Sequence, residues 1–525
     1  MICGYDGSYL FHDLPCVQEC LICMSELSSS RGLIKSMLVI GSAQFVNILI
    51  SIFRMKVLAV LLGPNGVGML SIYNSLLEMV QQTAGLGIGS SGVREIASSR
   101  GDGATLSRVR RVLFAAHLIQ GTLAIITVWL LQERIAIWLF GDALLAMEVG
   151  LIGIAILLSL LATTQMVLLQ GLRRIVDMGR VTVIGAFIGT LVGLAAVWLQ
   201  GERGLIWFIV VQPLATVLIA LNYTRRLPKP ITIRLSLFEA WSVWKSMAKL
   251  GFAFMLGGLA TAATLLLVRS LITKELGLDA AGYFAAAWGI AITYVGFLLA
   301  AMGADYYPRL TEVIHDKFAV VRLVNDQIQL ALAIGGPILL LFIGLSPWLI
   351  ILFYSTAFEP AGKLLQWQMV GNVFKLAGWA MSFSIVAAAR GKMFFLIELG
   401  FNIVFFGMVF IYLPHVGLEV TAYAFVMGYF VYLIIAYIMA RSIHGFHLQF
   451  LSIGLLGLHT SLGFALLMLA LIAPLAAAIV SPLLAAAAGI FGLRIVLSKV
   501  GNHGRLPTWF YGIFARLGWS IQSSV

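Results

Sequence analysis

The chain has 525 residues, of which 61% are hydrophobic and only 11% are charged, and its formal net charge is +12. Soluble globular domains carry about 25% charged residues, so this composition, with a mean hydropathy of +1.00, excludes an ordinary soluble protein. The basic residues are spread between apolar segments. This spread argues against a nucleic-acid surface and favours membrane topology as the cause of the positive charge.

Residues 1–34 are expected to form a poorly ordered N-terminal extension. They lack the basic-then-apolar order of a signal peptide. Cys16, Cys20 and Cys23 have a spacing loosely like that of a metal site, but no fourth ligand is convincing, so no metal site is predicted. Deletion of residues 1–23 is expected to leave membrane insertion and activity unchanged.

Apolar windows long enough to cross a bilayer as helices, about 20 residues each, recur along the rest of the chain. They cover residues 36–62, 66–90, 112–131, 144–169, 181–199, 205–222, 247–272, 280–303, 328–346, 364–388, 393–413, 417–440, 453–473 and 476–497. The sequence therefore predicts an all-α polytopic membrane protein with about 14 transmembrane helices.

The orientation follows from the basic residues between the windows. An even number of crossings places both termini on one side, and almost all Lys and Arg outside the windows fall on that side. The exceptions are Arg134, Arg203, Lys274 and Lys363. Because basic residues are retained on the cytoplasmic side, both termini are predicted to be cytoplasmic.

The basic, proline-containing segment 224–246 is predicted to be a cytoplasmic linker between two six-helix bundles, residues 35–223 and 247–441. Residues 442–525 would add two helices and a tail. An internal repeat supports this division, because the segment 62–70 resembles the segment 276–284, and Gly89 matches Gly303 at the same offset along the chain. The two bundles are expected to be pseudo-symmetric and to surround a central cavity.

Polar residues form a stripe on each of the first two windows. Gln44, Asn47, Ser51 and Arg54 share one face of the first helix, and Asn74, Glu78, Gln81 and Gln82 share one face of the second. A charge at the centre of a bilayer costs about 2.5–3.5 kcal/mol on insertion scales, so such residues normally face a bundle interior or a water-filled cavity. The two stripes predict a polar cavity.

Further candidates extend this cavity into the second half. The predicted cations are Arg54, Lys56, Arg269 and Lys375, and the predicted polar lining is Gln44, Asn47, Asn74, Gln81, Gln82, Gln368, Asn372 and Trp379. For Arg54 and Lys56 the alternative is that they snorkel toward the interface. For each single amide the alternative is an interhelical hydrogen bond worth about 0.6 kcal/mol.

Glu78 and Glu398 are the carboxylates deepest in the apolar windows. A buried carboxylate can bind and release a proton during a transport cycle, so both are candidates for ion coupling. Charge balance against Arg54 or Lys375 is an equally good explanation.

Three stretches carry a resemblance to a known family. They are Lys56–Gly68 (KVLAVLLGPNGVG), Gly85–Ile88 (GLGI) and Trp367–Lys375 (WQMVGNVFK). The chain from about Lys35 to Arg441 resembles the O-antigen and enterobacterial-common-antigen translocases, which are lipid-linked oligosaccharide flippases of the multidrug/oligosaccharidyl-lipid/polysaccharide flippase superfamily. Beyond Arg441 the chain departs from the twelve-helix pattern of these proteins.

The resemblance implies that the protein moves an undecaprenyl-diphosphate-linked glycan across the bacterial inner membrane, from the cytoplasmic to the periplasmic leaflet, by alternating access. It implies no enzyme activity and no cofactor. The expected partners are the lipid-linked substrate, membrane lipids and other membrane proteins of glycan assembly, and no nucleic acid. The alternative is a cation-coupled multidrug exporter of the same superfamily, which would favour an acidic cavity over one that holds Arg and Lys.

Overall fold

The computed structural model describes residues 16–227, 231 and 236–500, and all regular structure in these residues is helical. The helices of the first half are α1 (Cys16–Gly85), α2 (Ile88–Ser98), α3 (Gly103–Phe140), α4 (Ala146–Gly171), α5 (Ile175–Gln200) and α6 (Gly204–Thr224). Those of the second half are α7 (Leu237–Leu276), α8 (Leu278–Glu312), α9 (Lys317–Phe353), α10 (Ala361–Ala387), α11 (Gly391–Val416), α12 (Val420–His444), α13 (Phe450–Ile472) and α14 (Pro474–Val500). The predicted all-α class is confirmed.

Length and composition identify 11 membrane-spanning helical segments within the described residues. Three of them, 41–85, 175–224 and 391–444, are far longer than the roughly 20 residues that one crossing needs. Each overlaps two of the predicted windows and contains a glycine with positive φ, namely Gly63, Gly201 or Gly417. The total of 14 crossings stays a prediction.

The first helix differs from the sequence expectation at its start. It begins at Cys16, so residues 16–34, which were expected to lack regular structure, form its first turns. Within this long element Gly63 has φ 64° and ψ −165°, a conformation that only glycine adopts readily. The break at Gly63 separates the predicted windows 36–62 and 66–90.

Helix breaks and N-terminal caps recur in the two halves of the chain at nearly the same sequence interval. Gly63 and Gly277 both break the helix with positive φ, and so do Gly201 and Gly417 at nearly the same spacing along the chain. Asp102 and Asp316 cap the N-termini of α3 and α9 by accepting from Ala104 N and Phe318 N. The internal duplication stays a prediction, and these equivalent turns and caps are what it would produce.

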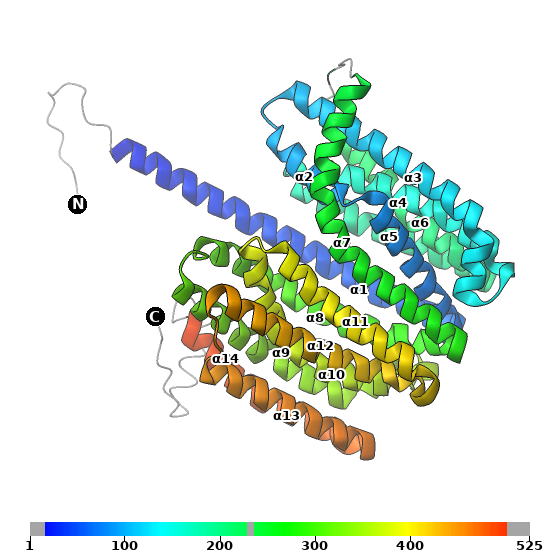
Figure 1. Ribbon diagram of the computed structural model, residues 1–525, viewed down its shortest axis with the longest axis vertical. Coiled ribbons are helices and arrows are strands. Elements are labelled where there is room, and N and C mark those ends of the chain that lie inside the picture. Colours follow the sequence, from blue (N-terminus) through cyan, green and yellow to red (C-terminus); the bar gives the residue numbers. More distant parts are fainter. Residues whose placement is uncertain (1–15, 228–230, 232–235, 501–525) are drawn as a thin grey trace.

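Figure 1 shows two groups of helices, α2–α6 and α8–α14, with the first part of α1 running between them. Helix α7 packs against both groups. Near the start of α2, Gly251 of α7 approaches Gly87 so closely that a side chain would not fit between them. Near the other end of α7, Ser270 donates to the Trp138 carbonyl of α3 at 3.0 Å. On its other side, Asn402 of α11 donates to Thr261 of α7 at 3.4 Å. Helix α7 therefore joins the two bundles.

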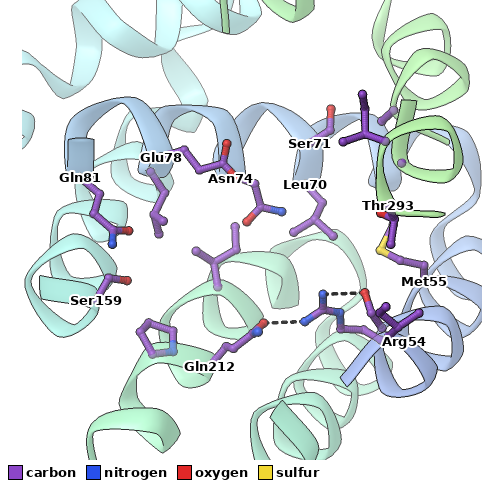
Figure 2. Close-up of a pocket in the computed structure, with 18 of the residues that line it drawn as sticks. Arg54, Met55, Leu70, Ser71, Asn74, Glu78, Gln81, Ser159, Gln212 and Thr293 are labelled. Carbon is purple, nitrogen blue, oxygen red and sulfur yellow. Dashed lines mark hydrogen bonds between the residues drawn. The ribbon is translucent and has the colours of Figure 1, made fainter. Parts of the chain in front are cut away.

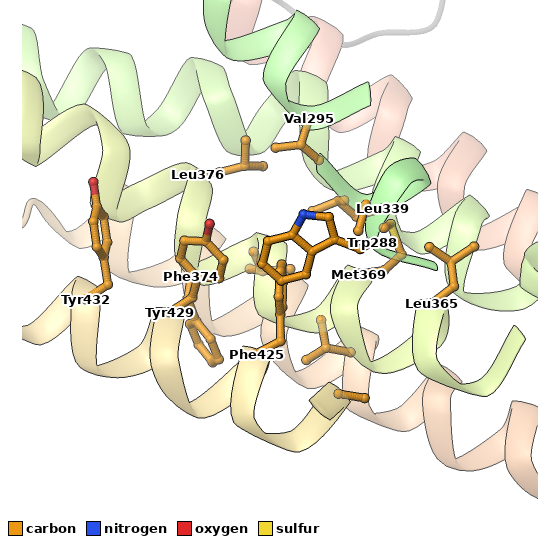
Figure 3. Close-up of a cluster of buried hydrophobic side chains, with 14 of the residues drawn as sticks. Trp288, Val295, Leu339, Leu365, Met369, Phe374, Leu376, Phe425, Tyr429 and Tyr432 are labelled. Atoms are coloured by element: carbon orange, nitrogen blue, oxygen red, sulfur yellow. The ribbon is translucent and has the colours of Figure 1, made fainter. Parts of the chain in front are cut away.

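The C-terminal bundle has the larger apolar core. Figure 3 shows Trp288 of α8 at the centre of a cluster that includes Met369 of α10 and Phe425 of α12. The ring of Trp288 meets that of Phe425 edge to face, with the centroids 5.5 Å apart. Burial of several aromatic rings per helix stabilises this bundle by dispersion and by specific ring geometry.

Helices α13 and α14, whose role the resemblance leaves undefined, are docked on α9. The buried Asn325 of α9 donates to the His447 carbonyl and accepts from Gln449 N and Ser452 Oγ, at 2.7–2.9 Å. Lys499 of α14 forms an ion pair with Asp326 of α9. These contacts anchor the two added helices to the C-terminal bundle.

Candidate functional site: a cationic cavity between the bundles

A cavity of about 1210 Å³ lies between helices of both halves. It is bounded by α1, α2, α4 and α6 on one side and by α7, α8 and the end of α9 on the other. Its charged and amide side chains are Arg54, Asn74, Glu78, Gln81, Gln170, Gln212 and Arg269. Ser51 and Arg54 from the first predicted stripe line this cavity, and so do Asn74, Glu78 and Gln81 from the second.

Arg54 lies at one end of this cavity, with Glu78 and Gln81 toward the other (Figure 2). Its Nη1 donates to Gln212 Oε1 of α6 at 2.8 Å and its Nη2 donates to Ser51 Oγ at 3.2 Å. The guanidinium carbon lies 5.7 Å from the ring centroid of Phe208. These contacts hold Arg54 within the N-terminal bundle and argue against snorkelling.

Arg269 reaches the same cavity from α7. Its Nη1 donates to the Ser71 carbonyl at 2.9 Å and also to Ser75 Oγ, both on the second part of α1. Glu78, one turn beyond Ser75, lines the cavity and interacts electrostatically with Arg269. The cavity thus holds two arginines and one carboxylate, and its net charge suits an anion, because guanidinium groups match phosphate oxygens in geometry and charge.

Lys375 lies elsewhere. It lines a second, smaller hollow of about 540 Å³ with Tyr307, Trp379 and Phe383, and its Nζ lies 5.1 Å from the ring centroid of Tyr429. The expectation that Lys375 shares one cavity with Arg54 is not what the structure shows. Residue spacing along a helix places a side chain on a face, but it does not say which neighbouring helix covers that face.

The remaining predicted residues of the second half, Gln368, Asn372 and the half-buried Glu398, lie within the C-terminal bundle. Gln368 and Asn372 are fully buried, and Asn372 donates to the Ala291 carbonyl at 3.1 Å. Glu398 accepts from the Tyr432 hydroxyl at 3.3 Å and interacts electrostatically with Lys375. For Asn372 the structure favours the interhelical hydrogen bond, and for Glu398 it favours charge balance against Lys375.

Four predicted residues of the first half are absent from the cavity lining among the described residues: Gln44, Asn47, Lys56 and Gln82. Lys56 Nζ donates to the Ile351 carbonyl of α9 at 2.8 Å. Gln44 and Gln82 are exposed. The polar face of each helix is wider than the part that the cavity uses, so the stripes overestimate the lining.

The sequence reasoning missed the partners that hold the arginines. Gln212, beside Pro213 in an otherwise apolar span, is a polar signal that could have identified α6 as a wall of the cavity. Ser71 and Ser75 give no such signal, because serine is common in membrane helices and its role here depends on α7 lying beside α1.

Comparison with known proteins agrees with this architecture. Residues 57–363 match the family described as polysaccharide biosynthesis protein. The lipid III flippase of Escherichia coli (strain K12) is 24% identical over 386 residues, which cover 72% of this chain and 90% of the relative. The lipid III flippase of Shigella flexneri matches to the same extent.

Two solved structures share the fold. An inward-facing multidrug resistance MATE family transporter of the MOP superfamily has a TM-score of 0.65 and 16% identity, covering 78% of this chain and 97% of the other. The lipid II flippase MurJ in an inward closed conformation has a TM-score of 0.64 and 13% identity, covering 86% of this chain and 98% of the other.

These matches confirm the predicted multi-pass membrane transporter, as opposed to an enzyme, and they confirm the predicted resemblance to oligosaccharide flippases. The family match covers more than half of the chain, from the first part of α1 to α10. It includes Glu78 and Arg269 of the central cavity and begins shortly after Arg54. The chain belongs to the polysaccharide biosynthesis protein family.

Proposed function

We propose that the protein is a flippase that moves an undecaprenyl-diphosphate-linked oligosaccharide, an O-antigen or related repeat unit, from the cytoplasmic to the periplasmic leaflet of the bacterial inner membrane. The observation that carries the proposal is the pair Arg54 and Arg269 in one cavity between the two bundles. A diphosphate loses its hydration in such a cavity, and two guanidinium groups replace the lost interactions with charge-assisted hydrogen bonds.

The uncharged polar lining suits a glycan. Asn74, Gln81 and Gln212 present amide donors and acceptors to the cavity, and Trp288 adds an aromatic ring to its wall. Sugars need many hydrogen bonds and little charge, so this wall complements the two arginines. The volume of about 1210 Å³ is larger than a typical drug-sized pocket of about 300–1000 Å³.

Alternating access supplies the transport step in this proposal. One bundle would rock against the other, exposing the cavity first to the cytoplasmic and then to the periplasmic side. Glu78, which lines the cavity, is the stronger of the two candidates for ion coupling, because Glu398 lies apart from it.

Complementation tests the proposal. The gene would be expressed in cells that lack their O-antigen or common-antigen flippase, and lipid-linked repeat units would be measured on each side of the inner membrane. Restored movement to the periplasmic side supports the proposal. Continued accumulation on the cytoplasmic side, with the protein present in the membrane and with several glycans tried, contradicts it, and drug efflux by the same cells would favour the multidrug exporter.

A further inference from the structure

The second part of α1 and α8 meet without side chains between them. An added Cβ at Gly68 would overlap the Leu278 carbonyl oxygen and lie 2.9 Å from Gly282 N. An added Cβ at Gly282 would overlap the Pro64 carbonyl oxygen and lie 2.7 Å from the Pro64 carbonyl carbon. The contact is reciprocal, because Gly68 and Gly282 are separated along the chain by the same interval as Pro64 and Leu278.

This contact lies near the start of both helices, beside the lining of the central cavity. Val67, Leu70 and Ser71 on α1 line the cavity, and so does Ala285 on α8. Gly68 and Gly282 lie beside them, next to the breaks at Gly63 and Gly277. The distribution of Lys and Arg predicts that this end is periplasmic.

Hydrogen bonds link the contact to Arg269. Ser71 Oγ donates to the Gly68 carbonyl at 2.8 Å, and Arg269 donates to the Ser71 carbonyl and to Ser75 Oγ. Arg269 belongs to α7, in the second half of the chain, so these bonds tie the two halves together one turn from the glycines. The hydrogen bonds of Arg54, in the same cavity, go instead to Ser51 and Gln212 of the first half.

We infer that Gly68 and Gly282 form the periplasmic gate of the transporter and that Arg269 couples this gate to the substrate. Before substrate binds, Arg269 holds α7 to α1 and keeps the gate shut. A diphosphate that reaches Arg269 competes with Ser71 and Ser75 for the guanidinium, which weakens the tie and favours opening. The coupling rests on the proposed function, whereas the gate itself depends only on the packing of α1 and α8.

Spin labels on the two bundles measure the gate directly. Cysteines would replace Ala143 and Glu359, two exposed positions in the connections that follow α3 and α9, in a protein whose own cysteines are replaced. Double electron–electron resonance in nanodiscs then reports the distance between the bundles at this end. No transport is needed, so the result is independent of complementation.

The first arm tests the glycines. Gly68→Ala and Gly282→Ala should each shift the distance distribution to longer values, because a methyl group cannot fit against the opposing carbonyl. The matched control is Gly407→Ala on α11, where an added Cβ meets no atom within 4 Å. An unchanged distribution in both gate variants overturns the assignment of the gate. Ser75→Ala, which adds no bulk, should give a smaller shift in the same direction and guards against misfolding of the glycine variants.

The second arm tests the coupling with undecaprenyl diphosphate, and with undecaprenol as the control that lacks the anion. The diphosphate should lengthen the distance in the parent, and undecaprenol should not. In Arg269→Ala the distance between the labels should be longer even without lipid, and the diphosphate should not lengthen it further. In Arg54→Ala the distance without lipid should equal that of the parent. If the glycine variants open the gate but the diphosphate leaves the parent unchanged, the coupling through Arg269 is wrong.

Discussion

Arg54 and Lys375 lie in separate hollows, Arg54 against Gln212 of α6 and Lys375 over the ring of Tyr429 in the C-terminal bundle. Their sequence contexts are alike, since each is a basic residue on a polar helix face. Their surroundings differ, because Arg54 shares a cavity with Arg269 and Glu78 and Lys375 does not. Arg54 is therefore the better candidate for direct contact with a diphosphate.

Replacement of Arg54 by Ala should lower flipping about tenfold or more, because one charge-assisted hydrogen bond to a phosphate is worth about 1.5–3 kcal/mol and about 1.4 kcal/mol is a factor of ten. Arg54→Lys should keep part of the activity, since the charge survives and the planar donor geometry is lost. The measurement is the amount of lipid-linked repeat unit on the periplasmic side at equal protein abundance. Lys56→Ala is the control and should flip as the parent does, because Lys56 bonds to Ile351 outside the cavity.

The double variant Arg54→Ala, Lys375→Ala should lose activity by the product of the two single fold-losses. Side chains that are far apart and share no partner usually contribute additively in free energy. The test is a double-mutant cycle on initial flipping rates. If Lys375→Ala alone lowers the rate but adds no loss to Arg54→Ala, both cations act on one group, contrary to their separation in the structure.

Asn325→Ala should destabilise the attachment of α13 and α14. The backbone N–H of Gln449 and the hydroxyl of Ser452 both lose a buried acceptor, and each such loss costs about 1–3 kcal/mol. The expected results are a lower melting temperature in detergent and faster proteolysis between α12 and α13. Ser442→Ala, which removes an exposed bond within α12, should change neither.

Both termini are predicted to be cytoplasmic, from the asymmetry of Lys and Arg between the spans. A phosphatase that is active only in the periplasm should therefore be inactive when fused after Val525. The same enzyme fused within the connection at 201–203 should be active. Activity at Val525 would reverse the orientation and with it the side on which Gly68 and Gly282 form a gate.

The class of the protein and the polar faces of its helices follow from the amino-acid sequence alone. An apolar composition with few charges leaves no alternative to a membrane environment, and helical periodicity alone places Arg54, Asn74 and Glu78 toward a polar interior. The predicted windows 36–62 and 66–90 already leave a gap at residues 63–65, and the structure breaks the helix there at Gly63. These features depend on neighbours in the chain.

Which polar faces meet depends on how the helices pack in the folded protein. Lys375 and Arg54 belong to different hollows, Lys56 turns to a carbonyl of α9, and Arg269 reaches across to Ser71 and Ser75. In a membrane the surrounding lipid is as apolar as the helix surfaces, so hydrophobicity does not select neighbours. Close packing selects the neighbouring helices, as at Gly68 and Gly282. Such packing joins residues from opposite halves of the chain, and no local sequence pattern encodes it.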